Sequence, residues 1–177
     1  MRKEKSFIID NLLYSEVNNI NSSFRLKLRN MTEDYANRGL YHSGVFVSDQ
    51  LSILSEKVML GCNNTITNIY NYQNLWNRKF NNREIDIISK KMATSFISLI
   101  DSLLTNLVNP TENLQSTIEL SANNLRQNLN NTIKTKFEEI KNHNKLYRES
   151  ASIRQIWWSI GVAALSLIVS IIALLKN

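Results

Sequence analysis

Twenty consecutive residues without a charged side chain, Ile156 to Leu175, constrain this chain more than any other feature. As an α-helix this segment would be about 30 Å long, which matches the hydrocarbon thickness of a bilayer. Trp157 and Trp158 lie at its start, where amphipathic rings favour the headgroup region. A buried helix of a water-soluble core rarely runs so long without a polar face. The sequence therefore predicts a transmembrane helix over residues 156–175, with residues 176–177 as a short outside tail.

Basic residues are concentrated just before this segment. They include Lys141, Lys145, Arg148 and Arg154, whereas only Lys176 follows it. Because cytoplasmic loops carry an excess of Lys and Arg, we expect a single-pass, tail-anchored protein with residues 1–155 in the cytoplasm. The side chains from Lys141 to Arg154 would then meet anionic lipid at the bilayer surface.

The rest of the chain is predicted to be helical. It has few turn residues, with only four Gly and one Pro among 177 residues. A small β-sandwich or barrel needs many more turn residues than this. Apolar residues instead recur every three or four positions, and in places they follow the eleven-residue repeat of a nearly straight stripe. We expect an all-α fold, an up-and-down bundle of long amphipathic, coiled-coil-like helices followed by the transmembrane helix.

Four helices are expected, over residues 5–37, 45–80, 83–108 and from 111 onward. Gly39 suits the C-terminal end of the first helix, and Ser43 suits the N-cap of the second. Gly61 is expected to be a weak point within the second helix. Two alternatives remain for the fourth helix, which either continues into the transmembrane segment or breaks near Asn142–Asn144. The inward positions of the first and third helices are predicted to be Ile9, Leu13, Val17, Ile20, Phe24, Leu28, Met31 and Tyr35, and Ile85, Ile88, Met92, Phe96, Leu99, Leu103 and Leu107.

Residues suited to catalysis or metal binding are scarce. The chain has two histidines, His42 and His143, and one cysteine, Cys62, and none of them forms a metal-ligand motif. Helical HEPN ribonucleases carry Arg, four to six residues, then His, whereas Arg38 and His42 are separated by three. We therefore predict no enzymatic activity and no cofactor, and we expect no nucleic-acid partner. The alternative reading is a membrane-tethered helical-bundle protein that resembles a ribonuclease or binds nucleic acid.

Small residues recur along one side of the predicted transmembrane helix. We call Ser159, Ala163, Ser166, Ser170 and Ala173, which are spaced four and three residues apart, the small-residue seam. Small residues allow close helix packing in lipid, and Ser can hydrogen-bond across the contact. The seam predicts a homo-oligomer or pairing with another membrane helix.

These features lead to a functional expectation. Helices followed by an apolar segment are similar in outline to SNARE-like proteins, to small phage holin-like proteins and to membrane effectors of bacterial defence systems. The eleven-residue repeat departs from the unbroken heptads of a SNARE. We expect a membrane-anchored, non-enzymatic protein that self-assembles through its bundle and its transmembrane helix. It would either bind a protein partner on the bundle or act as a membrane-perturbing, pore-forming oligomer.

Overall fold

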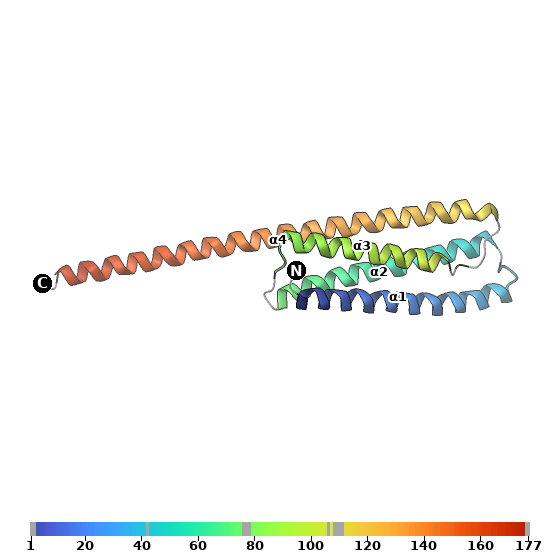
Figure 1. The fold of residues 1–177 in the computed structure, drawn as a ribbon, viewed down its shortest axis with the longest axis horizontal. Coiled ribbons are helices and arrows are strands. Elements are labelled where there is room, and N and C mark those ends of the chain that lie inside the picture. The colour runs from blue at the N-terminus through green and yellow to red at the C-terminus, as the bar shows by residue number, and fades with distance from the viewer. Residues whose placement is uncertain (1–2, 42, 76–78, 106, 108–111, 176–177) are drawn as a thin grey trace. The chain divides into compact units, whose positions relative to one another are not determined.

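The computed structural model describes residues 3–41, 43–75, 79–105, 107 and 112–175, while the side chains of residues 75, 112, 113, 164 and 167–175 lie outside this description. It contains the helices α1 (Lys3–Asn37), α2 (Gly44–Leu75), α3 (Asn82–Leu104) and α4 (Glu112–Leu175) (Figure 1). No strand occurs among the described residues. The all-α prediction is therefore confirmed. The chain divides into two compact units, Met1–Glu138 and Glu139–Asn177.

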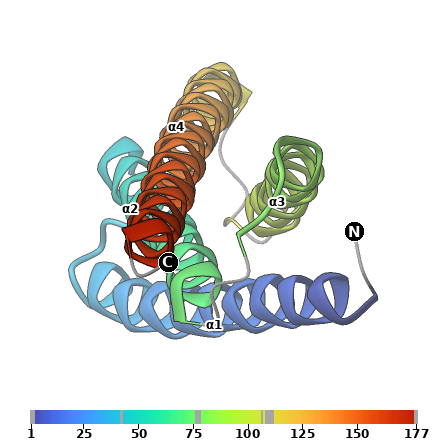
Figure 2. The same ribbon diagram turned by 90° about the vertical axis from the view of Figure 1, so that its left-hand side faces the viewer.

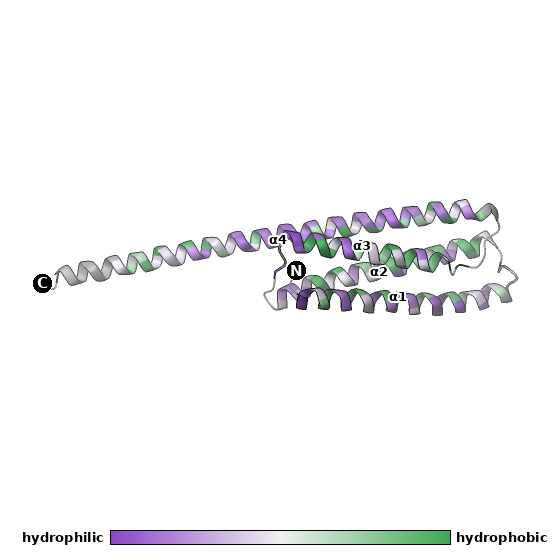
Figure 3. Cartoon of the chain, viewed as in Figure 1, coloured by the Kyte–Doolittle hydropathy of each residue, from purple (hydrophilic) through white to green (hydrophobic). Residues whose placement is uncertain are grey.

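The first unit is a bundle built from α1, α2, α3 and the first part of α4. Successive helices run in opposite directions, as predicted for an up-and-down bundle (Figure 1), and α1 crosses its neighbours obliquely (Figure 2). Hydrophobic and hydrophilic residues alternate along α1 with the period of a helix (Figure 3). The fully buried large side chains include Ile9, Phe24, Leu54, Ile69, Ile88, Phe96, Leu103 and Leu129.

The helical spacing of apolar residues in the sequence predicted most of this core. All seven inward positions predicted for the third helix are buried. In α1, five of the predicted positions are buried, whereas Val17, Leu28 and Met31 are only half-buried. Sequence periodicity therefore found the phase of each helix, but not how deeply each residue along a stripe is buried.

Both predicted caps at the first turn are confirmed. Gly39 adopts a left-handed backbone with a φ of 70°, and the backbone N–H of Leu40 donates to the carbonyl of Tyr35 at 2.9 Å. The Ser43 hydroxyl accepts from the backbone N–H of Phe46 at 3.2 Å. The Phe46 ring packs against those of Tyr35 and Tyr41, with centroids 5.0 and 5.3 Å apart. These contacts close the α1–α2 turn.

The sequence predicted that the second helix ends at Phe80, whereas α2 ends at Leu75. Phe80 is followed by Asn81, the N-cap of α3, which forms a capping box with Glu84. The Asn81 side chain accepts from the backbone N–H of Glu84 at 2.8 Å, and Glu84 accepts from the backbone N–H of Asn81 at 3.0 Å. The pattern Asn-x-x-Glu carries this signal in the sequence, from which we had predicted only that one helix ends at residue 80 and the next begins at residue 83.

α3 also ends early, at Leu104 rather than at Val108. Thr105 is its C-cap, and its hydroxyl donates to the carbonyl of Ser102 at 2.7 Å. Hydroxyl side chains that bond to nearby backbone carbonyls compete with helix continuation. Val108 itself lies outside the described residues, as do Trp76, Asn109 and Pro110.

Gly61 is a point of close helix packing rather than a weak point. A Cβ atom at this position would lie 2.8 Å from Cγ1 of Ile20 and 3.0 Å from Oε1 of Glu16. Real Cβ atoms do not approach side chains this closely. Gly61 therefore marks a close approach of α2 to α1, where a larger residue would force the Ile20 side chain to shift.

The second unit consists of the remainder of α4. The helix continues through Asn142–Asn144 to Leu175, so the alternative with a break there does not hold. In the part of the chain that the structure describes, no helix has the length and apolar character needed to cross a membrane. Of the predicted transmembrane segment, the side chains of residues 164 and 167–175 lie outside that description.

Candidate functional site

Residues 151–166 of α4, which we call the exposed apolar stretch, present large hydrophobic side chains to solvent. Every described side chain in it is exposed. The large apolar members are Ile153, Ile156, Trp157, Trp158, Ile160, Val162 and Leu165, with Trp157 and Trp158 68% and 76% exposed. Successive helical residues are rotated by about 100°, so this set surrounds the helix rather than forming one stripe. Single exposed hydrophobic residues are common, but a contiguous group marks an interaction site.

The predicted site residues of the second unit fall into described and undescribed groups. Ile156, Trp157 and Trp158 belong to the exposed apolar stretch, whereas the side chain of Leu175 is not described. In the small-residue seam, the side chains of Ser159, Ala163 and Ser166 are exposed, whereas the side chains of Ser170 and Ala173 are not described.

Ser159 already uses its hydroxyl within its own helix. The hydroxyl lies 2.8 Å from the carbonyl oxygen of Ile156 and 3.1 Å from that of Gln155. A hydrogen bond from Ser159 to another helix would have to compete with these local ones.

The predicted basic residues lie on the turns just before the exposed apolar stretch and at its start. Lys145, Arg148 and Arg154 are exposed and Lys141 is half-buried. Lys145 lies 3.9 Å from Glu149, and Arg154 Nε donates to the carbonyl of Ser150 at 3.4 Å. Exposed ion pairs of this kind contribute at most about 1 kcal/mol. An anionic surface could therefore displace the pairing at little cost.

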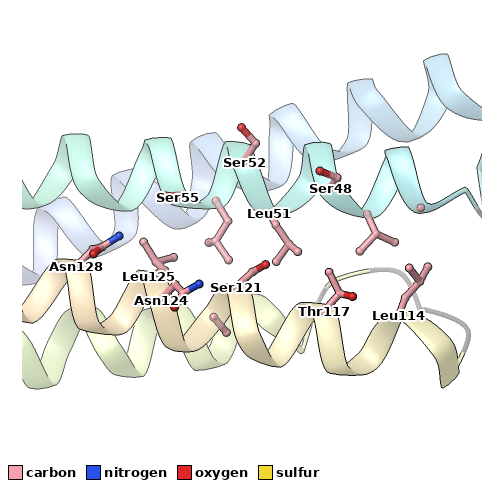
Figure 4. Close-up of a pocket in the computed structure, with 14 residues that line it drawn as sticks. Ser48, Leu51, Ser52, Ser55, Leu114, Thr117, Ser121, Asn124, Leu125 and Asn128 are labelled. Atoms are coloured by element: carbon pink, nitrogen blue, oxygen red, sulfur yellow. The ribbon is translucent and has the colours of Figure 1, made fainter.

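A groove of about 330 Å³ separates α2 from the first part of α4 (Figure 4). We call it the α2–α4 groove. Leu51 extends from α2 toward α4, Thr117 and Ser121 extend from α4 toward α2, and Ser52 points outward. Its polar lining residues are Ser48, Ser52, Ser55, Thr117, Ser121, Asn124 and Asn128. None of its described lining residues is charged. We did not predict this groove, although the four-and-three spacing of these residues is visible in the sequence.

The contact between α1 and α3 is charged. Lys5 pairs with Glu84 at 3.1 Å, and Lys91 pairs with Asp10 at 2.8 Å. Burial alone would raise the pKa of Glu84, but the hydrogen bond from the backbone of Asn81 and the ammonium group of Lys5 lower it below its usual value. These ion pairs fix α1 against α3 and join the α3 capping box to the N-terminal turn of α1.

Groups that could support catalysis are not arranged for it among the described residues. Cys62 is buried, and desolvation raises its pKa to about 12, which disfavours the nucleophilic thiolate. Arg38 pairs with Asp34 at 3.2 Å, whereas His42 lies outside the described residues. In the described part of the chain, no three His, Cys, Asp or Glu side chains gather in a manner that could hold a metal ion.

Tyr35, near the end of α1, forms a hydrogen bond with Asp49, in the second turn of α2. The Tyr35 hydroxyl donates to the carboxylate of Asp49. This hydrogen bond, together with desolvation, raises the pKa of Tyr35 above its usual value. The contact holds the turn closed, and we assign it a structural role.

Comparison of the chain with protein-family models, with curated proteins and with solved structures finds no match. The functional argument therefore depends on the surfaces described above.

Proposed function

We propose that the protein is a membrane-anchored, non-enzymatic helical bundle whose uncharged α4 segment enters the bilayer. The observation that carries the proposal is the exposed apolar stretch, in which hydrophobic side chains surround the helix. Water disfavours such a surface by about 25 cal/mol for each Å² of apolar area. The first unit has its own buried core, so the stretch is not needed to complete it. Lipid is the solvent that accepts a helix that is apolar on all sides.

The sequence supports the same proposal beyond the described side chains. The run without charge begins at Ile156, within the exposed apolar stretch, and continues to Leu175, which makes it long enough for a bilayer. Trp157 and Trp158 would lie at the headgroup level, with Arg154 directed toward the anionic surface. The basic residues from Lys141 to Arg154 would place the bundle on the cytoplasmic side.

Flotation of the full-length chain with lipid vesicles tests the anchor. The wild-type protein should float with vesicles and resist a high-salt wash, because hydrophobic insertion is not screened by salt. The double variant Ile160→Asp/Leu165→Asp should lose this salt-resistant binding, since an Asp at the centre of an inserted helix, as at position 165, costs about 2.5–3.5 kcal/mol.

A matched control is available on the bundle. Leu26→Asp/Leu60→Asp makes the same chemical change at two side chains of similar exposure. This control should float as the wild type does. If both double variants bind equally well, or if wild-type binding disappears in high salt, the anchor proposal is wrong.

Two activities would suit such an anchor, namely holding a protein partner at the membrane and perturbing the membrane as an oligomer. Release of a dye trapped inside the vesicles separates them. A membrane-perturbing oligomer should release the dye steeply with protein concentration, whereas a tether should leave it enclosed. Ser166→Leu/Ser170→Leu, which fills the small-residue seam without reducing its hydrophobicity, should weaken any release that depends on close helix packing.

A further inference from the structure

The first turns of α4 are packed more loosely than the rest of that helix within the bundle. From Leu114 to Asn124, Ala122 is the only buried residue among the described side chains, whereas Leu114 and Ile118 are half-buried. Farther along the same helix, Leu129 is fully buried. Segments with few buried apolar side chains are the parts of a fold that open at the lowest cost in free energy.

Two grooves lie along this segment. One is the α2–α4 groove of about 330 Å³ (Figure 4). Its polar lining residues form two rows, on α2 (Ser48, Ser52 and Ser55) and on α4 (Thr117, Ser121, Asn124 and Asn128). The other, which we call the α3–α4 groove, has a volume of about 590 Å³ and lies between the end of α3 at Leu104 and the turn of α4 that contains Ile118. A helix bordered by two grooves makes fewer close contacts with its neighbours and is held more weakly.

The other helices of the bundle meet through closer contacts. α2 approaches α1 closely at Gly61, and the two ion pairs described above join α1 to α3. Arg126 of α4 pairs with Asp101 of α3 at 2.5 Å, at the C-terminal end of the loosely packed turns. The contacts therefore favour a separation in which the first turns of α4 leave, α1, α2 and α3 stay together, and the hinge lies near Arg126.

Gln50 of α2 supplies a driving force for this separation. Its side chain is 0% exposed, and no described residue forms a hydrogen bond with its Oε1 or its Nε2. A buried amide without partners raises the free energy of the closed state, because it has lost its hydrogen bonds to water. Gln50 is three residues from Val47 and four from Leu54, which both line the α2–α4 groove, so it lies beside that groove on α2. Separation of α4 from α2 would restore the hydration of the amide.

We propose that residues 114–126 of α4, which we call the hinged segment, open away from α2 and α3 while the rest of the bundle stays folded, and that the buried amide of Gln50 favours the open state. Opening uncovers apolar side chains that the closed bundle keeps from water, among them Leu54 and Leu125. The fold thus contains a device that exposes apolar surface without unfolding the bundle. This inference goes beyond the proposed membrane anchor and does not depend on it.

Thiol modification of the full-length chain in detergent tests the opening. Leu54→Cys places a thiol in the lining of the α2–α4 groove, and the native Cys62, eight residues farther along α2, serves as the internal reference. Leu54 and Cys62 are both 0% exposed, so each thiol reacts only when the structure opens over it. The thiol at position 54 should react with a maleimide at least about tenfold faster than Cys62. Equal rates would show that α2 is uncovered only when the whole bundle unfolds, and would overturn the proposal.

Replacement of Gln50 separates the effect of its amide from that of loose packing. Gln50→Met keeps an unbranched side chain but removes the amide, so in the Leu54→Cys background it should slow modification at position 54 about tenfold. Gln73 provides the matched control, since it is also 0% exposed on α2 but its Oε1 accepts from the backbone N–H of Phe80 at 3.5 Å. Gln73→Met should not slow the reaction. If Gln50→Met leaves the rate unchanged or raises it, the proposed role of Gln50 is wrong.

Hydrogen exchange followed by mass spectrometry tests the opening without a new thiol. In the wild-type chain, protection factors within the hinged segment should be at least about tenfold lower than those of residues 127–137 in the same helix. Gln50→Met should raise protection in the hinged segment about tenfold, which would not happen if the low protection came only from fraying of a helix end. Equal protection of the two parts in the wild-type chain would contradict a hinge near Arg126.

Discussion

The two parts of α4 illustrate two ways in which a helix can carry hydrophobic residues. From Leu125 to Phe137 the large apolar side chains recur every four residues and are buried, while most of the intervening polar residues are exposed. In the exposed apolar stretch, large hydrophobic residues lie around the helix rather than along one stripe, and they are exposed. In the first arrangement, the hydrophobic side chains are already buried within the bundle. The second requires an environment that the described structure does not supply.

The largest contrast is expected from a charge placed in each part. Phe24 is fully buried in the bundle, so Phe24→Asp should unfold it or cost about 4 kcal/mol or more, because an unpaired charge would enter the core. Ile160→Asp should leave the thermal unfolding of the bundle unchanged while weakening vesicle binding. Circular dichroism during heating measures the first effect. Equal loss of bundle stability in both variants would contradict the division between the two parts.

Two glycines inside helices, Gly61 and Gly161, provide a second comparison of the two parts, with an effect of intermediate size. Gly61→Val would drive a side chain into Ile20, and overpacking of this kind costs about 1–3 kcal/mol. Apart from the neighbouring residues and backbone of its own helix, nothing lies within 4 Å of where a Cβ of Gly161 would be, so Gly161→Val should not affect bundle stability. Urea unfolding of the two variants would reveal the difference. A tolerated Gly61→Val would show that α1 and α2 do not meet closely there.

A smaller effect is expected at the junction of α1 and α3. The folded-state pKa of Glu84 is lowered, so its stabilising contribution is present above the ordinary pKa of a carboxyl group and is lost as the pH falls through the folded-state value. Glu84→Gln should therefore cost about 1 kcal/mol near neutral pH and progressively less in acid.

An exposed acidic residue provides the control for Glu84. Glu33 pairs with Arg29 on the surface of α1, with its side chain 63% exposed. Glu33→Gln should change stability by no more than about 0.5 kcal/mol at any pH. If the difference in stability between wild type and Glu84→Gln does not depend on pH, the ionised capping box is not what stabilises this junction.

The sequence predicted the periodic features well because burial of a helix face repeats every turn. It predicted the phase of α3 residue by residue, the left-handed Gly39 and the cap at Ser43. It did not predict the role of Gly61, because close packing against Ile20 depends on which helices cross and where. The end of α3 was placed too late because the side-chain hydrogen bond of Thr105 to the carbonyl of Ser102 competes with a continuing helix. The end of α2 was also placed too late, and Phe80 lies instead just before the N-cap of α3.

The candidate surfaces divide in the same way. Most of the exposed apolar stretch could be found from sequence, since the run without charge that begins at Ile156 is a local property. The α2–α4 groove could not, because its two rows lie more than 60 residues apart along the chain and only the fold brings them together. The interpretation of the small-residue seam remains a prediction, with Ser170 and Ala173 outside the described side chains.

The central claim is that the exposed apolar stretch enters lipid, and site-specific labelling tests it most directly. Ile160 and Leu60 are both 52% exposed, one in the stretch and the other on the bundle. An environment-sensitive fluorophore attached to Ile160→Cys or Leu60→Cys reports whether each position is in water or hydrocarbon. When vesicles are added, the label at position 160 should shift to the emission of an apolar environment and be quenched by lipid-borne quenchers, whereas the label at position 60 should remain accessible to aqueous iodide. If the label at position 160 stays as accessible to iodide as the one at position 60, the account is contradicted.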